Sequence, residues 1–518
     1  PMHWSRLVDL PIAGIIVLLR PFIGAHWAEV VSCVTVPILT LGLMCIAYLW
    51  ALRRFMGTGV AVFTVALLVT CFAILAQTPP LRIDHHAWQI LMAAIISGGI
   101  IHDNPRKGGV IAGLAMAMWL HISSEGLPAA AMVGGVLGVR YVLRAQEWPR
   151  LIAYFGTLVA GSVLLLLITH GVAASLINHC DSMSPVYLLT LTAMVPVLVA
   201  GRIICGSGNF ARRAIPFAMA LCAASLTFSK VGGACLAGPF ATMDPLVYRF
   251  WLTGVMEGQP IWRQAALTQT IMLAVSLTGM AGLSFAYFRE TDADRRVNWL
   301  SLLMLTSGGL LVAMTVLRSM GTAHLFALPG IAYGIAQVYQ RVRVLPNMPA
   351  RVAGTLLLCL PSPAGIAVVA AQLTPGDSSD TPAQPPKNLG ARELAKLSVL
   401  PPSVMFASLD VGPDILLRTK HSVIGTGHHR NIAGIKLVLE GFLAPPAKAR
   451  EIILSTPSSY VLIVPEQGET GHYVKASKTG LMSQLMSGHI PAWLVPVKID
   501  GLKFARVYRV IRPEPIAH

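Results

Sequence analysis

The chain contains 518 residues, 55% of them hydrophobic and only 12% charged, and its mean hydropathy is +0.66. Since a soluble domain carries about 25% charged residues, the composition excludes a soluble globular protein and indicates a polytopic α-helical membrane protein. The formal net charge of +16 does not indicate nucleic-acid binding, because the basic residues lie in short loops between apolar runs, as the positive-inside rule describes.

The apolar runs are concentrated in residues 1–373, and many of them approach the roughly 20 residues that a membrane-spanning helix needs. We expect a transmembrane domain over this range, with twelve spans at about 27–52, 58–76, 86–101, 109–123, 127–143, 151–173, 186–203, 213–229, 264–287, 298–317, 322–339 and 351–371. The chain starts at Pro1, in a polar stretch without a signal peptide. We therefore expect further residues, with a thirteenth span, upstream of Pro1.

The charges in the loops predict how the spans are oriented. One set of loops is rich in basic residues and is expected to face the cytoplasm; it contains Arg53, Arg54, Arg106, Lys107, Arg140, Arg144, Arg150, Arg202, Arg212, Arg213, Arg289, Arg295, Arg296, Arg341, Arg343 and Arg351. The other set is poor in basic residues and is expected on the outer face of the cytoplasmic (inner) membrane. Cys180 and Cys235 fall near outer loops, where a disulfide could join them.

A short polar island, residues 82–89, lies between the apolar runs 58–76 and 87–101 and reads Arg-Ile-Asp-His-His-Ala-Trp-Gln. Asp84 and His86 are good ligands for a divalent cation, and one intervening residue lets both side chains converge on one ion where a turn meets a helix start. The alternative is structural: Asp84 caps the following helix, and the histidine sits at the membrane interface.

The longest outer loop, about residues 231–262, carries a further carboxylate, Glu257. Loops of this length are usually functional or disordered, and aromatic residues argue against disorder here: Phe240, Tyr248, Phe250 and Trp251. We expect a flap that lies on the membrane surface or over a cavity. The alternative for Glu257 is a solvated loop carboxylate.

Two more charged residues lie at the outer ends of spans. Glu125 sits at an outer turn, where it could contact a substrate or serve only as a helix-start carboxylate favoured by the helix dipole. Arg318 closes an apolar span; its guanidinium could bind a lipid-linked phosphate or anchor the span at the interface. Ionisable residues at membrane depth are costly, which favours functional roles.

A linker rich in proline, serine and aspartate, residues 374–391, separates the spans from a different composition. Residues 392–518 are expected to form an extracytoplasmic α/β domain, with β-like runs at 403–408, 422–425, 460–464, 492–499 and 504–511 around a helical stretch at 432–455. His428, His429 and Arg430 follow the second run. They could bind an anionic or sugar acceptor, or they could form a polar helix start.

These residues together suit one chemistry. A divalent cation such as Mg²⁺ or Mn²⁺, held by carboxylates and a histidine, can neutralise the charge that develops on a phosphate leaving group. A nearby arginine can bind the same phosphate. The donor would be a lipid phosphate, because nucleotide sugars are not available outside the cytoplasmic membrane.

The layout resembles the GT-C membrane glycosyltransferases, most closely the catalytic subunit of oligosaccharyltransferase and its bacterial relatives. With one span before Pro1, residues 82–86 fall in the second outer loop, where that family has an Asp-x-Asp or Asp-x-His metal motif. Residues 231–262 become the fifth outer loop, in which the family has a Glu, here Glu257. Arg318 ends the eleventh span, where the family's arginine binds the lipid phosphate.

Two features of that family are not found. Its acidic residue in the first outer loop is not identifiable, because Asp9 sits beside a span start and not in an acidic motif; we expect this residue upstream of Pro1. The Trp-Trp-Asp acceptor motif is also absent, since the outer domain has a single tryptophan, Trp493. This argues for an acceptor other than an Asn-X-Ser/Thr site.

The resemblance implies a glycosyltransferase that moves a sugar or oligosaccharide from a polyprenyl-phosphate or polyprenyl-diphosphate donor to a glycan, lipid or protein acceptor, among membrane lipids. Asp84 and His86 would be metal ligands, and Arg318 would bind the lipid phosphate. Glu257 and Glu125 would be the catalytic carboxylates. Glu257 would be a ligand or would position the acceptor on a closing loop, and Glu125 would contact the substrate or support residues that do. The alternatives are a transporter or flippase of lipid-linked substrates, which predicts polar residues in mid-span, and an inactive scaffold of the same fold.

Overall fold

In a computed structural model of the chain, residues 5–240, 243–374 and 391–512 are described. The chain divides into two compact units. The first, which we call the helical unit, comprises Met2–Ala241 and Met256–Pro375. The second, the C-terminal unit, comprises Thr242–Val255 and Gly376–His518, together with Pro1. Most of the expected linker, residues 375–390, lies outside the described residues.

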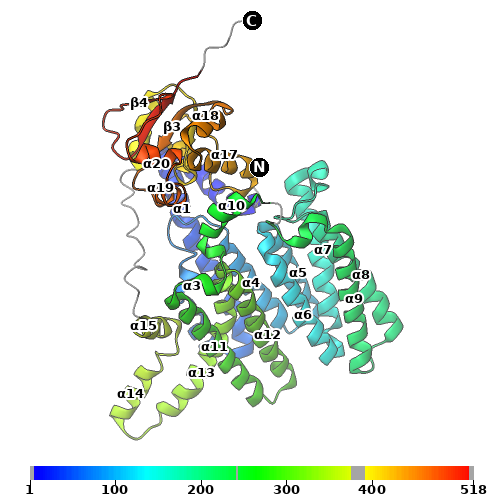
Figure 1. The fold of residues 1–518 in the computed structure, drawn as a ribbon. Helices are drawn as coiled ribbons and strands as arrows, with labels where there is room; N and C mark the ends of the chain where they lie inside the picture. The colour runs from blue at the N-terminus through cyan, green and yellow to red at the C-terminus, as the bar shows by residue number, and fades with distance from the viewer. Residues whose placement is uncertain (1–4, 241–242, 375–390, 513–518) are drawn as a thin grey trace. The chain divides into compact units, whose positions relative to one another are not determined.

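Each of the twelve expected spans contains helix in the structure (Figure 1). The helices of the helical unit are α1 (Asp9–Met56), α2 (Thr58–Leu68), α3 (Phe72–Leu75), α4 (His86–Ile101), α5 (Pro105–Ile122), α6 (Leu127–Leu143), α7 (Trp148–Ser175), α8 (Pro185–Cys205), α9 (Phe210–Val231), α11 (Ala266–Arg289), α12 (Ala293–Thr315), α13 (Met320–Val342), α14 (Met348–Leu357) and α15 (Pro363–Leu373). Seven of the described helical segments are long and apolar enough to cross a membrane. The number of spans therefore stays a prediction.

The first helix differs from the expectation, because α1 begins at Asp9 and not near residue 27. It is two helical segments joined at Gly24, whose φ of 77° and ψ of 168° are not helical. Only glycine adopts that conformation without steric cost. The segment before Gly24 folds back on the one after it, since the Ser32 hydroxyl donates to the Ile12 carbonyl at 2.8 Å.

Small residues let two helices of the unit touch backbone to backbone. A Cβ atom built at Gly282 of α11 would collide with the carbonyl of Gly330 in α13, and one built at Gly330 would collide with the carbonyl of Gly279. Such close crossings are typical of helices that pack within membranes. The contact holds α11 against α13, the helix that begins just after the turn that carries Arg318.

A buried ion triad ties other helix ends together. Glu147, between α6 and α7, accepts hydrogen bonds from Arg140 at 3.0 and 3.1 Å and from Arg150 at 2.7 Å. Arg140 also donates to Asn298 of α12 at 2.8 Å, and Arg150 donates to the carbonyl of Gly99 in α4 at 2.6 Å. The three charged side chains are at most 7% exposed. The carboxylate offsets one of the two positive charges, and the network joins α4, α6, α7 and α12.

The C-terminal unit contains a five-stranded sheet of order β2-β1-β3-β5-β4. Its strands lie in the five runs where strands were expected: β1 (Val404–Ala407), β2 (Ser422–Val423), β3 (Ser458–Ile463), β4 (Leu494–Val497) and β5 (Arg506–Val510). β1 pairs in parallel with β2 and β3, and β5 pairs antiparallel with β3 and β4. This agrees with the small α/β domain expected from the sequence.

The expected helical stretch is two helices, α17 (Ile432–Leu443) and α18 (Pro446–Leu454). Three further short helices were not predicted, because each is too short to show an amphipathic repeat: α16 (Gly412–Arg418), α19 (Gly468–Ala476) and α20 (Leu481–Met486). α17 buries its apolar face on the sheet, where the Phe442 ring lies 5.2 Å from that of Phe406 in β1.

The long loop after α9 is divided between the two units. Its helix α10 (Pro245–Phe250) packs on α17 in the C-terminal unit, where Asp244 and Lys436 form an ion pair of 2.7 Å. Met256 and the residues after it belong to the helical unit. Glu257 is therefore held by different contacts from those that hold the aromatic half of the loop.

Candidate functional site

Residues 82–86 form the turn that leads into α4. His86 is the first residue of α4 and is 4% exposed. The backbone N–H of His85 donates to Asp84 Oδ1 at 2.6 Å, and His86 Nε2 lies 3.6 Å from Asp84 Oδ2. The residue at the helix N-cap is His85, without a side-chain capping bond. The alternative role of Asp84, as a helix cap, is therefore not supported.

The turn has a strained entry. Leu81 has a φ of 71°, the only positive φ at a non-glycine residue in the described parts of the chain. A left-handed conformation costs such a residue roughly 1–2 kcal/mol. The Leu81 N–H donates to the carbonyl of Cys33 in α1 at 3.0 Å, which helps to hold the chain in this shape and to aim Asp84 inward.

Glu257 joins the same cluster from the loop after α9. It lies in a short 3-10 turn, Met256–Gly258, and its Oε1 is 3.7 Å from His86 Nε2. Arg82 Nη2 lies 3.5 Å from both Glu257 Oε2 and Asp84 Oδ2. Sequence reasoning assigned no role to Arg82; the available signal was its place at the head of the polar island.

Glu125 and Arg318 meet on the other side of His86. Glu125 lies in the turn Ser124–Gly126 between α5 and α6, and Arg318 in the turn Leu317–Ser319 between α12 and α13. Arg318 Nε is 3.1 Å from Glu125 Oε1, and Arg318 Nη1 is 3.8 Å from Glu257 Oε1. The Nε–H is buried and is not aligned with a hydrogen-bond acceptor among the described residues. The Nε edge of the guanidinium therefore faces Glu125, and its Nη1 faces Glu257.

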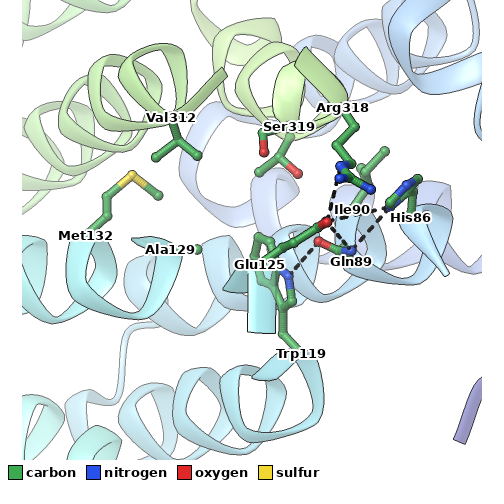
Figure 2. A pocket seen from close by; sticks show the side chains of 12 residues that line it. His86, Gln89, Ile90, Trp119, Glu125, Ala129, Met132, Val312, Arg318 and Ser319 are labelled. Carbon is green, nitrogen blue, oxygen red and sulfur yellow. Dashed lines mark hydrogen bonds and ion pairs between the residues drawn. The ribbon is translucent and has the colours of Figure 1, made fainter. Parts of the chain in front are cut away.

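Two buried residues that sequence reasoning missed connect these groups (Figure 2). The indole Nε1–H of Trp119, in α5, donates to Gln89 Oε1 at 3.0 Å. The Gln89 amide nitrogen donates to Glu125 Oε2 at 3.3 Å and lies 3.3 Å from His86 Nδ1. The available signal was the place of Gln89 one helical turn after His86.

A pocket opens beside these residues. His86, Gln89, Glu125 and Arg318 line one end of it, and Figure 2 shows apolar side chains further along. The apolar lining residues include Ile90, Ala129, Met132 and Val312. The pocket therefore has a charged end next to an apolar wall.

Both carboxylates nearest His86 favour the ionised form. Burial raises the pKa of Asp84, but the hydrogen bond from His85 and the electrostatic influence of both imidazoles together outweigh it and hold that pKa far below its usual range. The hydrogen bond with His86 is the main cause of the lowered pKa of Glu257, against burial and the charge of Asp84. Both groups are therefore carboxylates at neutral pH.

This donor set could hold a divalent cation. Ligand atoms of Asp84, His85 and His86 lie within 4.8 Å of one another, and the Glu257 carboxylate lies 3.7 Å from the His86 imidazole. Carboxylate oxygens and imidazole nitrogens are common ligands of divalent cations. The geometry brings together five of the predicted residues: Asp84, His86, Glu125, Glu257 and Arg318.

The remaining predicted residues have other contacts. His428, His429 and Arg430 belong to the C-terminal unit, where the two imidazoles stack with centroids 5.5 Å apart. Next to them, Asn431 caps α17 by accepting from the Gly434 N–H at 3.1 Å, so the segment does form a polar helix start. Asp9 pairs with Arg6 at 3.3 Å at the beginning of α1.

A scan against models of protein families found no match, and a search of curated protein sequences found none either. Solved structures do match. The archaeal oligosaccharyltransferase AglB from Archaeoglobus fulgidus, in complex with an inhibitory peptide and a dolichol-phosphate, matches with a TM-score of 0.69 and 15% identity over 96% of this chain. The same enzyme tethered to an acceptor peptide with the NVT sequon has a TM-score of 0.67, with 14% identity over 99% of this chain.

A third structure of that enzyme, in complex with Zn and sulfate, has a TM-score of 0.64 and 14% identity over 93% of this chain. The chain spans 62–66% of the length of these neighbours. Identities this low show the fold alone. They confirm at that level the resemblance to the GT-C glycosyltransferases, and with the apolar helices they indicate a multi-pass membrane protein.

Proposed function

We propose that this chain, which has the fold of a GT-C glycosyltransferase, transfers a sugar or oligosaccharide from a polyprenyl-phosphate or polyprenyl-diphosphate donor. The observation that carries the proposal is the convergence of Asp84, Glu125 and Glu257 on the buried His86, with Arg318 paired to two of these carboxylates. These residues come from four segments far apart in the sequence, and the contacts among them are 3.1 to 3.9 Å long. A structural role would not require so many charged groups beside one pocket.

The residues divide into a cation-binding set and a phosphate-binding set. Asp84 and His86 would hold a Mg²⁺ or Mn²⁺ ion, with Glu257 as a further ligand; the bound cation would neutralise charge on the leaving phosphate. The lowered pKa of Glu257 makes it a weak base and a good ligand, so we assign it to binding and not to proton transfer. Arg318 and Arg82 would donate to the phosphate oxygens.

Glu125 supports this arrangement from the other side. Its Oε1 lies against Arg318 Nε, and its Oε2 accepts from the Gln89 amide. Two contacts on one carboxylate restrict how the arginine can turn. Glu125 would therefore present the Nη atoms of Arg318 to the donor, beside the acceptor that attacks the sugar.

We further propose that the site faces the outside of the cytoplasmic membrane and that His428, His429 and Arg430 contact the acceptor, a glycan, lipid or protein. The disulfide between Cys180 and Cys235 supports the outer location, because disulfides persist in oxidising compartments. Both cysteines lie in loops of the set that is poor in basic residues.

Binding of undecaprenyl phosphate to the full-length protein in lipid nanodiscs tests the proposal. We expect Mn²⁺ to strengthen binding at least about tenfold, and Asp84→Asn to abolish that strengthening, because it removes a charged ligand. Asp103→Asn is the matched control, since Asp103 is exposed and has only a 3.8 Å ion pair with Arg54. Undecaprenyl phosphate that fails to bind, or binds equally well with and without Mn²⁺ in wild type, contradicts the proposal.

A further inference from the structure

Gln89 lies at the centre of the site, although it is neither a charged residue nor a strong cation ligand. It is 7% exposed, and its donor Trp119 is 3% exposed. Its amide contacts three groups: the Trp119 indole, the Glu125 carboxylate and the His86 imidazole. A buried amide with every polar atom engaged has a defined orientation.

Trp119 determines that orientation. An indole nitrogen can only donate, so the atom 3.0 Å from Trp119 Nε1 must be the amide oxygen of Gln89. The amide nitrogen then faces Glu125 Oε2 and His86 Nδ1, each at 3.3 Å. The Glu125 carboxylate accepts one of the two N–H groups, which leaves the second for His86.

We infer that Gln89, oriented by Trp119, is a positioning residue that makes His86 Nδ1 a hydrogen-bond acceptor and keeps the imidazole proton on Nε2. That proton faces Asp84 Oδ2 at 3.6 Å and Glu257 Oε1 at 3.7 Å. A neutral imidazole cannot accept at Nδ1 and ligate a cation through Nε2 at once, because one of its nitrogens carries the proton.

His86 therefore binds a cation through Nε2 only after the Gln89 amide turns away from Trp119. Metal-ligating histidines usually donate their second N–H to a carboxylate, and Glu125 Oε2 lies 3.9 Å from His86 Nδ1. The Gln89 amide, which donates to Nδ1, prevents Nδ1 from carrying a proton that it could donate to Glu125. The consequence is a weakened, readily exchanged cation, and this part of the inference rests on the proposed function.

The metal-binding test uses Mn²⁺ alone, titrated into the full-length protein in detergent and followed by electron paramagnetic resonance. Gln89→Met, which is similar in size and lacks the amide, should tighten Mn²⁺ binding about tenfold, within the range known for residues that orient metal ligands. Trp119→Phe frees the Gln89 amide to turn and should also tighten Mn²⁺ binding. Unchanged or weaker Mn²⁺ binding in both variants overturns the inference.

A background without the imidazole provides the control. In His86→Asn protein, Gln89→Met should give no gain in Mn²⁺ affinity, because the effect passes through the ring. A gain of the same size in that background would show that Gln89 acts on the carboxylates instead, and would overturn the inference. Thermal unfolding of each variant identifies any that is misfolded. If Gln89→Met is misfolded, Trp119→Phe replaces it in the comparison.

A second readout does not depend on the proposed function. Nitrogen-15 spectra of histidine-labelled, metal-free protein, assigned with the His86→Asn variant, report which ring nitrogen of His86 carries the proton. We expect the Nε2–H tautomer in wild type and a mixture in Gln89→Met. A wild-type ring protonated on Nδ1 overturns the role of Gln89, whereas a failure of wild type to bind Mn²⁺ contradicts only the cation-binding part of the proposed function.

Discussion

Two guanidinium groups, of Arg82 and Arg318, lie among three carboxylates at the site, those of Asp84, Glu125 and Glu257. The formal charges sum to one excess negative charge before the histidines are counted. A divalent cation would reverse that sign, and the site would then attract a phosphate. Cation binding and phosphate binding should therefore be coupled at the scale of these few residues.

The shape of the Arg318 side chain is as important as its charge. Arg318→Lys keeps the charge but removes the planar fork that reaches Glu125 and Glu257 together. We expect undecaprenyl phosphate to bind roughly tenfold more weakly or worse, since a hydrogen bond to a charged group contributes about 1.5–3 kcal/mol. Arg351→Lys, an exposed position in α14, should bind the lipid like wild type. Equal losses in both variants would refute a specific role for Arg318.

At the scale of elements, polar contacts near helix ends hold neighbouring segments of each unit together. The triad of Arg140, Glu147 and Arg150 joins α4, α6, α7 and α12, at the ends of α4, α6 and α12 opposite to those next to the site residues. In the C-terminal unit, Glu469 of α19 plays a comparable part. It accepts from the N–H groups of Leu409 and Asp410, both at 2.9 Å.

Removal of the shared acid should destabilise the helical unit strongly. Glu147→Ala leaves two buried guanidinium groups without their partner, a change that typically costs about 3–5 kcal/mol. We expect a large drop in the melting temperature of the purified protein in detergent, and a smaller one for Glu147→Gln. Glu451→Ala, which breaks an exposed pair with Lys448, is the control and should change the melting temperature little. A small effect of Glu147→Ala would mean that the triad is not structural.

The surroundings of Glu469 predict that its contribution to the stability of the C-terminal unit depends on pH. Burial, followed by the negative charge of Asp410, raises the pKa of Glu469 above its usual 4.5. Because the folded state then binds the proton more readily than the unfolded state, the contribution of Glu469 to stability increases as pH falls from neutral through the raised pKa. It levels off below the usual value.

Glu469→Gln tests this dependence, since glutamine imitates the uncharged form. We expect the variant's melting temperature, relative to wild type, to be higher at pH 7.5 than at pH values close to the usual carboxyl pKa. The transition to follow is that of the C-terminal unit, observed in the full-length protein. A difference between variant and wild type that does not change with pH contradicts the assignment.

At the scale of the whole molecule, the loop after α9 contributes to both units, and its first part is joined by a disulfide to the loop before α8. Cys180 and Cys235 are 55 residues apart in sequence, and their Cα atoms are 5.0 Å apart. The cross-link encloses α8 and α9, which pack on each other. It therefore restrains the start of the segment that leads to Glu257.

Loss of this disulfide should destabilise the protein by about 2–4 kcal/mol, the usual contribution of such a cross-link. We expect Cys180→Ser and Cys235→Ser to lower the melting temperature equally, with no further loss in the double variant. Cys222→Ser, at an exposed free cysteine, is the control. Two results would contradict a structural disulfide: different melting temperatures for the two single variants, or a wild-type melting temperature that does not change when reductant is added.

The sequence alone indicated the long helical segments and the approximate places of the five strands, because the length and period of an apolar run depend on local chemistry. It also indicated Asp84, Glu125, Glu257 and Arg318, since charged residues between apolar runs are conspicuous. The break at Gly24 was not predictable, because many glycines in the chain have ordinary helical angles.

Only the tertiary structure decided which of these groups meet. The contacts of Gln89 and Trp119 depend on how α4 packs against α5, and the spacing of Gln89 from His86 indicates only that these two side chains share a helix face. The division of the loop after α9 likewise depends on contacts with segments distant in the chain. Local sequence determines where a helix begins and ends, whereas the distances between side chains are set by the packing of whole helices.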